Sequence, residues 1–352
     1  MTVSGAALAR GFHVEVVDPL LRREFAGLPL VAGRFGTGSD VLGFDDDVSA
    51  DHDWGLRVTV LVPSRAVEVS QVLERELPES FAGYPVRFPL TSDPAPRHRV
   101  EVAVLDDFVR ARLGVGAEQG WTVRDWSSFT GQAVLELVAG PVFADDEGRW
   151  QRLRDRLAWY PDDVWRYLVA CAWKQLEQEL PFVGRTGSVG DELGSRIVAA
   201  RLAGVAVQLG LLLDRTWAPY SKWVGSVFAA APSGRVLPDL ARALAAADWR
   251  ERESGLCAAL EGLLQRQHEV GLGVGGTATW RFHDRQFRGV VEDLADRVLA
   301  AVGDPAVRDL PLGVGSVGQW VDAVDVLVRP GLRRAAQRGT TCAVTERTDV
   351  VV

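Results

Sequence analysis

The chain has 352 residues, enough for two domains, and its 47% hydrophobic and 24% charged residues are typical of a soluble globular protein. A net charge of −8 and a pI of about 5.3 argue against a long nucleic acid as the main partner, because proteins that bind one usually have a basic surface. A small substrate or a protein partner is expected instead.

The cysteines and the N-terminus indicate the compartment. Cys171, Cys257 and Cys342 are odd in number and widely spaced, so we expect neither a disulfide framework nor a zinc site. Residues 1–13 lack the apolar core of a signal peptide. The most apolar stretch, residues 197–213, is interrupted by polar residues and is short for a membrane span. The sequence therefore predicts a cytoplasmic protein with no membrane partner.

Up to about residue 110 the chain alternates strand-like runs with helical patterns. Runs rich in Val and Leu and bounded by Gly, Pro or Asp predict four strands. These runs are residues 29–35, 54–62, 84–90 and 98–105. Apolar residues at helical spacing predict a helix over 65–77, and the prolines of 91–97 predict a loop. This region is expected to be a mixed α/β unit.

From about residue 125 the pattern is helical. Residues 160–180 open with Pro161 and two acids, which suit the start of a helix, and then carry apolar residues every three or four positions. A second helix is predicted over 191–213, with Ser188 as a plausible cap. Further helical patterns cover 221–231, 236–247, 250–269, 283–302 and 316–327. No fixed repeat is visible, so we expect a helical bundle.

The expected fold class is therefore α+β. An N-terminal mixed sheet with helices occupies residues 1–115, an all-α helical bundle domain occupies 116–345, and 346–352 form a frayed tail.

The most informative segment is GTGSDVLGFDDDVSADHDW, residues 36–54. A strand is expected to end just before it, and a helix-like run is expected over 40–44. Glycines between a strand and a helix let backbone amides turn toward a ligand, and a helix N-terminus favours phosphate. Gly38 and Ser39 are therefore candidates for a phosphate cradle.

Acidic residues follow this cradle. Asp51 and Asp53 are two positions apart before a strand, so their carboxylates share a face while His52 points the other way. Glu101 is a lone acid in a later, mostly apolar strand, and it would complete a site suited to Mg²⁺, with Mn²⁺ as an alternative. Two such acids alone are more often a solvated turn, which is how we interpret residues 45–47. The combination favours a metal–nucleotide site.

The segment GSDVLGFDDDVSADHDW resembles the Gly-Ser…Asp-x-Asp signature of DNA polymerase β-like nucleotidyltransferases. More closely, most of the chain resembles an uncharacterised bacterial family (a domain of unknown function), common in actinobacteria and placed in that superfamily. LAWYPDDVWRYLVACAWKQ, PFVGRTGSVGDELGSRIVAARL, APYSKW and LGVGSVGQWVDAVDVL look like its helical-domain blocks. The resemblance implies a small mixed sheet holding two metals, followed by a helical domain that helps to bind substrate.

Carried onto this chain, the resemblance implies Gly38 and Ser39 as the phosphate cradle, Asp51 and Asp53 as metal ligands, and Glu101 as the matching third acid. The spacing from Gly-Ser to Asp-x-Asp is about one residue longer than the commonest form, which leaves the register of the cradle open. The resemblance says nothing about the substrate.

The helical part adds candidates for nucleotide or acceptor binding. A cation there could meet phosphate, and an acid could deprotonate a hydroxyl group. The cationic candidates are Arg185 and Lys222. The substrate-binding candidates are Asp191, Glu192, Arg196 and Tyr220, and Ser195 belongs to the same cluster. The alternative, that these residues are helix caps or surface ion pairs, is equally open.

The sequence thus predicts a Mg²⁺-dependent nucleotidyltransferase that moves a nucleoside monophosphate, AMP from ATP being the first choice, to a hydroxyl group of a small-molecule acceptor with release of pyrophosphate. Two alternatives stay open: a protein-adenylylating enzyme of the toxin–antitoxin type, and a non-catalytic nucleotide-binding regulatory protein that keeps the fold. No nucleic-acid partner is expected, and a homodimer is left open.

Overall fold

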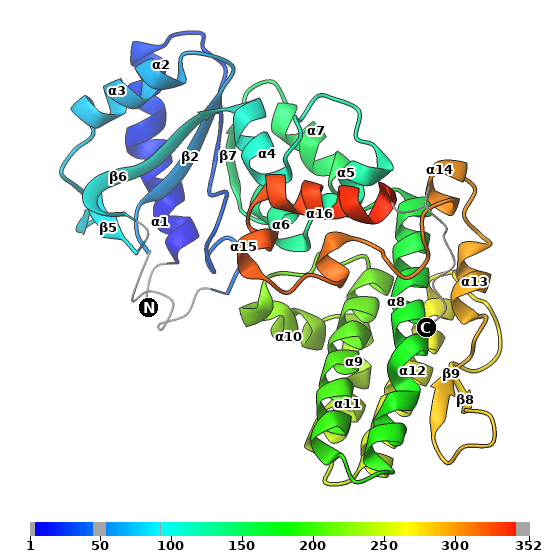
Figure 1. Ribbon diagram of the computed structural model, residues 1–352. Coiled ribbons are helices and arrows are strands. Elements are labelled where there is room, and N and C mark those ends of the chain that lie inside the picture. Colours follow the sequence, from blue (N-terminus) through cyan, green and yellow to red (C-terminus); the bar gives the residue numbers. More distant parts are fainter. Residues whose placement is uncertain (1–3, 45–53, 92, 343–352) are drawn as a thin grey trace. The chain divides into compact units, whose positions relative to one another are not determined.

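The computed structural model describes residues 4–44, 54–91 and 93–342. The chain divides into two compact units (Figure 1). The first consists of the chain up to Gly120 together with Ala133–Ala158. The second consists of Trp121–Gln132 together with the chain from Trp159 onward.

The first unit is built on a mixed five-stranded sheet with the strand order β5-β6-β2-β1-β7. β2 and β6 run parallel, and the other neighbouring pairs run antiparallel. The strands are β1 (Val31–Gly33), β2 (Arg57–Val62), β5 (Arg87–Leu90), β6 (Asp93–Val104) and β7 (Val142–Asp145), with a separate small hairpin of β3 (Ser80–Phe81) and β4 (Tyr84–Pro85).

Helices cover one face of this sheet (Figure 1). They are α1 (Gly5–Phe12), the π-helical turn η1 (His13–Val17), α2 (Asp18–Glu24) and α3 (Ala66–Glu76). Phe12 from α1 and Leu73 from α3 are buried with Val58, Val60 and Val100 from the central strands. Alternate residues of a strand face opposite sides, so this valine face leaves the intervening residues of β2 and β6 for the other side of the sheet.

On the other side lie α4 (Leu105–Leu113) and α7 (Arg149–Arg156). The Trp150 ring stacks on Phe35, just beyond β1, with 4.4 Å between ring centroids, and lies 6.1 Å from the Phe108 ring of α4. These aromatic contacts fix the chain that leaves β1 against the two helices.

The sheet extends beyond the boundary that the sequence predicts at residue 115. β7 pairs with β1, so residues 133–158 belong to the first unit. Arg22 of α2 donates to both carboxylate oxygens of Asp146, at 2.7 and 2.8 Å, and thereby fastens the segment after β7 to the N-terminal helices. A strand pairing between segments so far apart in the chain leaves no local signal, which is why the predicted boundary differs.

The second unit is mainly helical. Its longest helix, α8 (Asp162–Gly187), begins with two acids as expected but runs past the predicted end through Pro181, which is buried. In Figure 1, α8 runs beside α9 (Glu192–Leu213), and α12 (Trp249–Glu269) packs on both. The remaining helices are α5 (Val123–Ser128), α10 (Ser221–Ala230), η3 (Pro232–Val236), α11 (Leu237–Ala245), α13 (Leu294–Leu299), α14 (Pro305–Arg308), η4 (Val317–Gln319), α15 (Val324–Leu327) and α16 (Pro330–Cys342), and α6 (Gly131–Val138) begins where the chain returns to the first unit.

Two predictions for this unit were wrong. It is not all-α, because the first part of the predicted helix 283–302 contributes to a hairpin of β8 (Thr279–Arg281) and β9 (Arg288–Val290). The Glu261 carboxylate fixes this hairpin by accepting from the amides of Ala278 and Thr279, both at 2.9 Å. The predicted helix over 316–327 is two short helical turns, η4 and α15.

The predicted loop at 91–97 was also wrong, because β6 already begins at Asp93. The part of β6 before Arg99 pairs with β5 alone and extends beyond the start of β2. Pro94 and Pro96 therefore remove no hydrogen bond from a ladder with β2, and the strand tolerates them.

Among the described helices, α9 is long and apolar enough to cross a membrane by length and composition. Half of its apolar window is buried, and it packs against α8 and α12, as the core helix of a bundle does. Cys171 and Cys257 are buried free thiols, as expected from their helical patterns.

Candidate functional site

The loop that follows β1 is organised around one buried guanidinium group. Arg34, only 2% exposed, donates to both carboxylate oxygens of Asp40, at 2.6 and 2.9 Å. It also donates to the carbonyl oxygens of Phe35 and Thr37, at 2.7 and 2.8 Å. The side chain thus fixes the backbone of the loop from inside, and the predicted helix-like run that follows is a turn.

This arrangement leaves a run of backbone donors without acceptors. Within residues 4–44, 54–91 and 93–342, the amide groups of Thr37 to Val41 have no hydrogen-bond acceptor. Gly38 has a φ of +143°, and a Cβ atom there would lie 2.5 Å from Nη2 of Arg34 and 2.1 Å from Oδ1 of Asp40. The predicted cradle residue is therefore one that only glycine can fill without rearrangement. Consecutive unpaired amides in a turn favour an anion.

Strand register brings the third predicted acid near this loop. Gly33 pairs with Thr59 across β1 and β2, and Thr59 pairs with Glu101 across β2 and β6. The loop therefore leaves β1 at the end of the sheet where β2 begins, on the strand row that contains Glu101. β2 begins at this same end of the sheet. Asp51 and Asp53, the predicted metal ligands, lie outside the described residues.

A second arginine, Arg112, is partly buried and connects Glu101 with the loop. Nη2 of Arg112 lies 3.8 Å from Oε1 of Glu101, and its Nε lies 3.4 Å from Oε2 of Glu136. A Cβ atom on Gly36 would lie 3.0 Å from the same Nη2 atom, so the guanidinium group reaches the start of the loop. Burial lowers the pKa of Arg112 from its ordinary value, and the two glutamates oppose this shift.

The donor set partly fits a divalent cation. Mg²⁺ prefers carboxylate, phosphate and water oxygens. Glu101 offers a half-exposed carboxylate beside an anion cradle, whereas both oxygens of Asp40 are occupied by Arg34. No group of three or more His, Cys, Asp or Glu side chains suited to a metal occurs in the part of the chain that the structure describes. A metal here therefore needs further ligands, which is the role predicted for Asp51 and Asp53.

In the second unit, the predicted cluster around Asp191 makes structural contacts. Asp191 is the N-cap of α9, and its side chain accepts from the amide of Gly194 at 2.8 Å, so the cap is not Ser188. Glu192 accepts from the buried Arg252 at 3.0 Å, and Arg252 also donates to the Ser195 hydroxyl at 2.6 Å. These contacts join the start of α9 to α12.

The rest of this cluster follows the same pattern. Arg196 donates to the carbonyl oxygen of Ala247 at 3.2 Å. Gly187 is required by packing, because a Cβ atom there would lie 2.3 Å from the Trp249 side chain. Arg185 is exposed, and its side chain forms no ion pair with any described residue. Contacts within the unit thus explain Gly187 and the charged residues of this segment without a ligand, except for Arg185.

The predicted pair at the start of α10 is exposed. Tyr220 is the N-cap residue and 39% exposed, and its amide donates to the side chain of Gln132 at 3.2 Å. Nζ of Lys222 lies 4.9 Å from the centroid of the Trp223 ring, a cation–π contact. Both side chains are accessible to a ligand.

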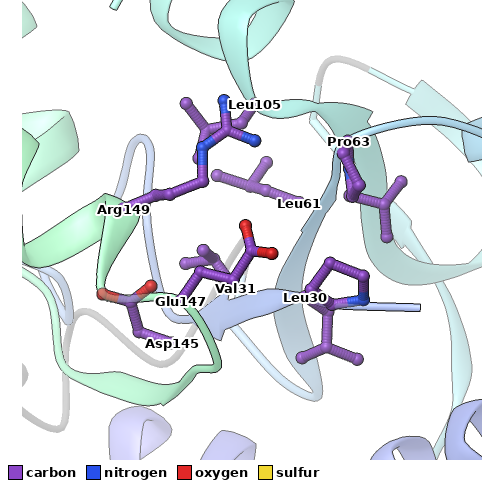
Figure 2. A pocket seen from close by; sticks show the side chains of 10 residues that line it. Leu30, Val31, Leu61, Pro63, Leu105, Asp145, Glu147 and Arg149 are labelled. Atoms are coloured by element: carbon purple, nitrogen blue, oxygen red, sulfur yellow. The ribbon is translucent and has the colours of Figure 1, made fainter. Parts of the chain in front are cut away.

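A shallow cavity lies at the opposite end of the sheet from the loop, where β1 begins and β2 ends. Figure 2 shows Glu147 and Arg149 on one side of it and Leu30 and Pro63 on the other. It has room for about one water molecule. The predicted site residues do not line this cavity, and we assign it no ligand.

Sequence reasoning missed Arg34 and Arg112. Arg34 had a local signal, since a charged residue between an apolar strand and a glycine-rich segment is positioned to order that segment. Arg112 had none, because its role depends on the packing of α4 beside β6 and on Glu136, which is more than twenty residues further along the chain.

The described residues thus define a mixed α/β unit and a mainly helical unit. Residues 126–224 match the model of a family described as "Domain of unknown function (DUF4037)". The chain is also similar to a solved structure of a nucleotidyltransferase-like protein from Exiguobacterium sibiricum, with 13% identity, 74% of this chain and 76% of that chain covered, and a TM-score of 0.31. A likeness at that TM-score carries no inference about this chain. No curated protein matches it.

Proposed function

We propose that the protein is a Mg²⁺-dependent nucleotidyltransferase that transfers a nucleoside monophosphate, AMP from ATP, to a hydroxyl group of a small-molecule acceptor and releases pyrophosphate. The observation that carries the proposal is the loop after β1, where five consecutive amides lack an acceptor among the described residues. The loop lies at the end of the sheet at which β2 begins, and Glu101 lies two strands from Gly33, the last residue of β1, in the same row of paired residues.

The loop suits phosphate for a physical reason. Arg34 is fully engaged with Asp40 and two carbonyl groups, so it holds the shape of the loop and leaves the amides to bind the ligand. An oxyanion that accepts several backbone N–H groups needs no exposed cation. The Ser39 hydroxyl is available to donate to the same anion.

The acids would supply the remaining chemistry. Bound by Glu101 together with Asp51 and Asp53, Mg²⁺ would neutralise negative charge on the triphosphate and on the departing pyrophosphate. Glu101 suits this role because it is half exposed and forms a contact of 3.8 Å with Arg112, longer than a hydrogen bond. The loop amides would hold the donor in place while the acceptor hydroxyl attacks.

In the second unit the proposal assigns substrate contacts to Arg185, Tyr220 and Lys222, whose side chains are exposed. Asp191, Glu192 and Arg196 are weaker candidates, because each has a structural partner.

Calorimetric titration with ATP, with and without Mg²⁺, tests the proposal. We expect binding that depends on Mg²⁺, and we expect Glu101→Gln to abolish both this dependence and nucleotidyl transfer without changing the melting temperature by more than a few degrees. Glu68→Gln is the matched control: Glu68 is 55% exposed against 52% for Glu101 and likewise contacts one arginine, but it lies on α3. Absence of ATP binding, or equal ATP binding with and without Mg²⁺, would contradict the proposal.

A further inference from the structure

The proposed reaction does not explain why the side chains of Glu101, Arg112 and Glu136 lie together. Two carboxylates from β6 and α6 share one guanidinium group from α4. Arg112 also contacts Phe108 of the same helix. Its guanidinium carbon lies 3.4 Å from the centroid of the Phe108 ring, and its Nη1 donates to the Phe108 carbonyl oxygen at 3.2 Å. The cation is therefore fixed in position.

The two acids hold this cation unequally. The Glu136 side chain is 16% exposed and its carboxylate oxygen lies 3.4 Å from Arg112. The Glu101 side chain is 52% exposed, and its nearest oxygen is 3.8 Å away. Glu136 is thus the permanent partner of Arg112. Glu101 can turn toward solvent and leave Arg112, because the guanidinium group then still has the Glu136 carboxylate beside it.

We propose that Arg112 is a built-in counter-cation for Glu101: it holds the carboxylate while no metal is bound and yields it to the metal, retaining Glu136. This inference rests on the proposed function and assigns a positioning residue to it. The arrangement would keep Glu101 oriented toward the loop and would make metal binding without nucleotide weak, because the metal must compete with a fixed positive charge. Phosphate in the loop would then add the negative charge that favours release of Glu101.

Mn²⁺ alone is a suitable probe, since the electron paramagnetic resonance signal of free Mn²⁺ reports binding without any turnover. In Arg112→Met the competing charge is gone, so we expect Mn²⁺ without nucleotide to bind roughly tenfold more tightly than to the wild type. In Glu136→Gln the guanidinium group loses the Glu136 carboxylate and keeps its contact with Glu101, and we expect Mn²⁺ to bind several-fold more weakly.

Opposite directions in the two variants are the result that a merely structural role of Arg112 would not give. Arg110→Met is the control: it lies on the same helix, is 52% exposed, pairs with Asp106, and should leave Mn²⁺ binding unchanged. If Arg112→Met does not fold, Glu136→Gln decides, and unchanged or tighter binding there overturns the inference.

The outcomes also separate this inference from the proposed function. A wild-type protein that binds neither Mn²⁺ nor ATP contradicts both. A wild-type protein that binds both, with Arg112→Met and Glu136→Gln unchanged or shifted in the same direction, contradicts the role of Arg112 alone.

Discussion

Two glycine-rich, charged segments of this chain have similar composition and opposite structural roles. Residues 34–41 of the first unit contain an arginine, an acid and glycines, and so do residues 184–196 of the second. In the first, Arg34 and Asp40 pair with each other, and the amides of Thr37 to Val41 have no acceptor within the described part of the chain. In the second, Asp191 caps a helix and Glu192 pairs with the buried Arg252, so the polar groups hold two helices together.

The difference indicates what would separate the proposed ligand loop from a segment that joins two helices. Glycines occur in both because something lies close to the backbone, but at Gly38 the neighbour is the loop's own arginine, whereas at Gly187 it is Trp249 of another helix. A segment that orders itself leaves its amides available. A segment ordered by its neighbours does not. Composition alone cannot distinguish the two segments, because the residues that order the second one, Arg252 and Trp249, are remote from it in sequence.

The largest effect is expected from Gly38→Ala. The added methyl group would collide with Arg34 and Asp40, and φ is in the region disfavoured for alanine, so the loop must rearrange. We expect ATP affinity measured by calorimetry to fall roughly a hundredfold. Gly43→Ala controls for backbone strain, since Gly43 also has a positive φ, of +78°, but has nothing within 4 Å of a Cβ atom. Equal losses of ATP affinity in the two variants would contradict the role assigned to the close approach of Arg34 and Asp40 to Gly38.

Arg252→Met tests the other segment. The variant leaves Glu192 and the Ser195 hydroxyl without their cationic partner in the joint between α9 and α12. We expect the free energy of unfolding to fall by about 2–3 kcal/mol, with ATP affinity unchanged. Arg242→Met, which removes an exposed ion pair with Asp239, should cost less than about 1 kcal/mol. A large loss of ATP affinity in a folded Arg252→Met protein would indicate that residues 184–196 contribute to ligand binding.

A smaller, pH-dependent effect is expected at Glu253, which lies beside Gly184 in the same joint. Burial raises the pKa of its carboxyl group from 4.5 to about 7, although the amide of Arg288 donates to it at 2.9 Å. Because the folded-state pKa is the higher one, the native state binds the proton more tightly. This stabilisation is present below about pH 4.5 and is lost as the pH rises through about 7.

Denaturant unfolding of the wild type and of Glu253→Gln at pH 5 and pH 8 measures this effect. From pH 5 to pH 8, the free energy of unfolding of the wild type should fall by about 1–2 kcal/mol more than that of the variant, because the glutamine amide does not titrate. A stability difference between wild type and variant that is the same at both pH values would show that Glu253 is not protonated in the native state.

Much of the fold could be predicted because it depends on local periodicity. The strands β1 and β2 and the helices α3, α9, α10, α11 and α12 all lie in or within one residue of the regions that apolar spacing indicated, and α8 begins in its region but extends past it. Errors arose where a remote contact decides the local structure. The hairpin of β8 and β9 depends on carboxylates of α12, and β7 joins a sheet whose other strands are far earlier in the chain.

The candidate site follows the same rule. The Gly-Ser loop and Glu101 could be proposed as site residues because a glycine-rich turn after a strand and a lone acid within one are local signals. That Glu192 pairs with a buried arginine could not be predicted, because Arg252 is about sixty residues away. The pairing of Arg34 with Asp40, six residues further along the chain, had a local signal that the sequence interpretation did not use.

The central claim is that the loop after β1 binds phosphate through its backbone, and amide hydrogen exchange tests it most directly. With Mg²⁺ and ATP added, the account predicts slower exchange in peptides that contain Thr37 to Val41, whose amides have no acceptor among the described residues, and no change in peptides covering 184–196. ATP binding with unchanged exchange in the loop, or with protection confined to 184–196, would contradict it.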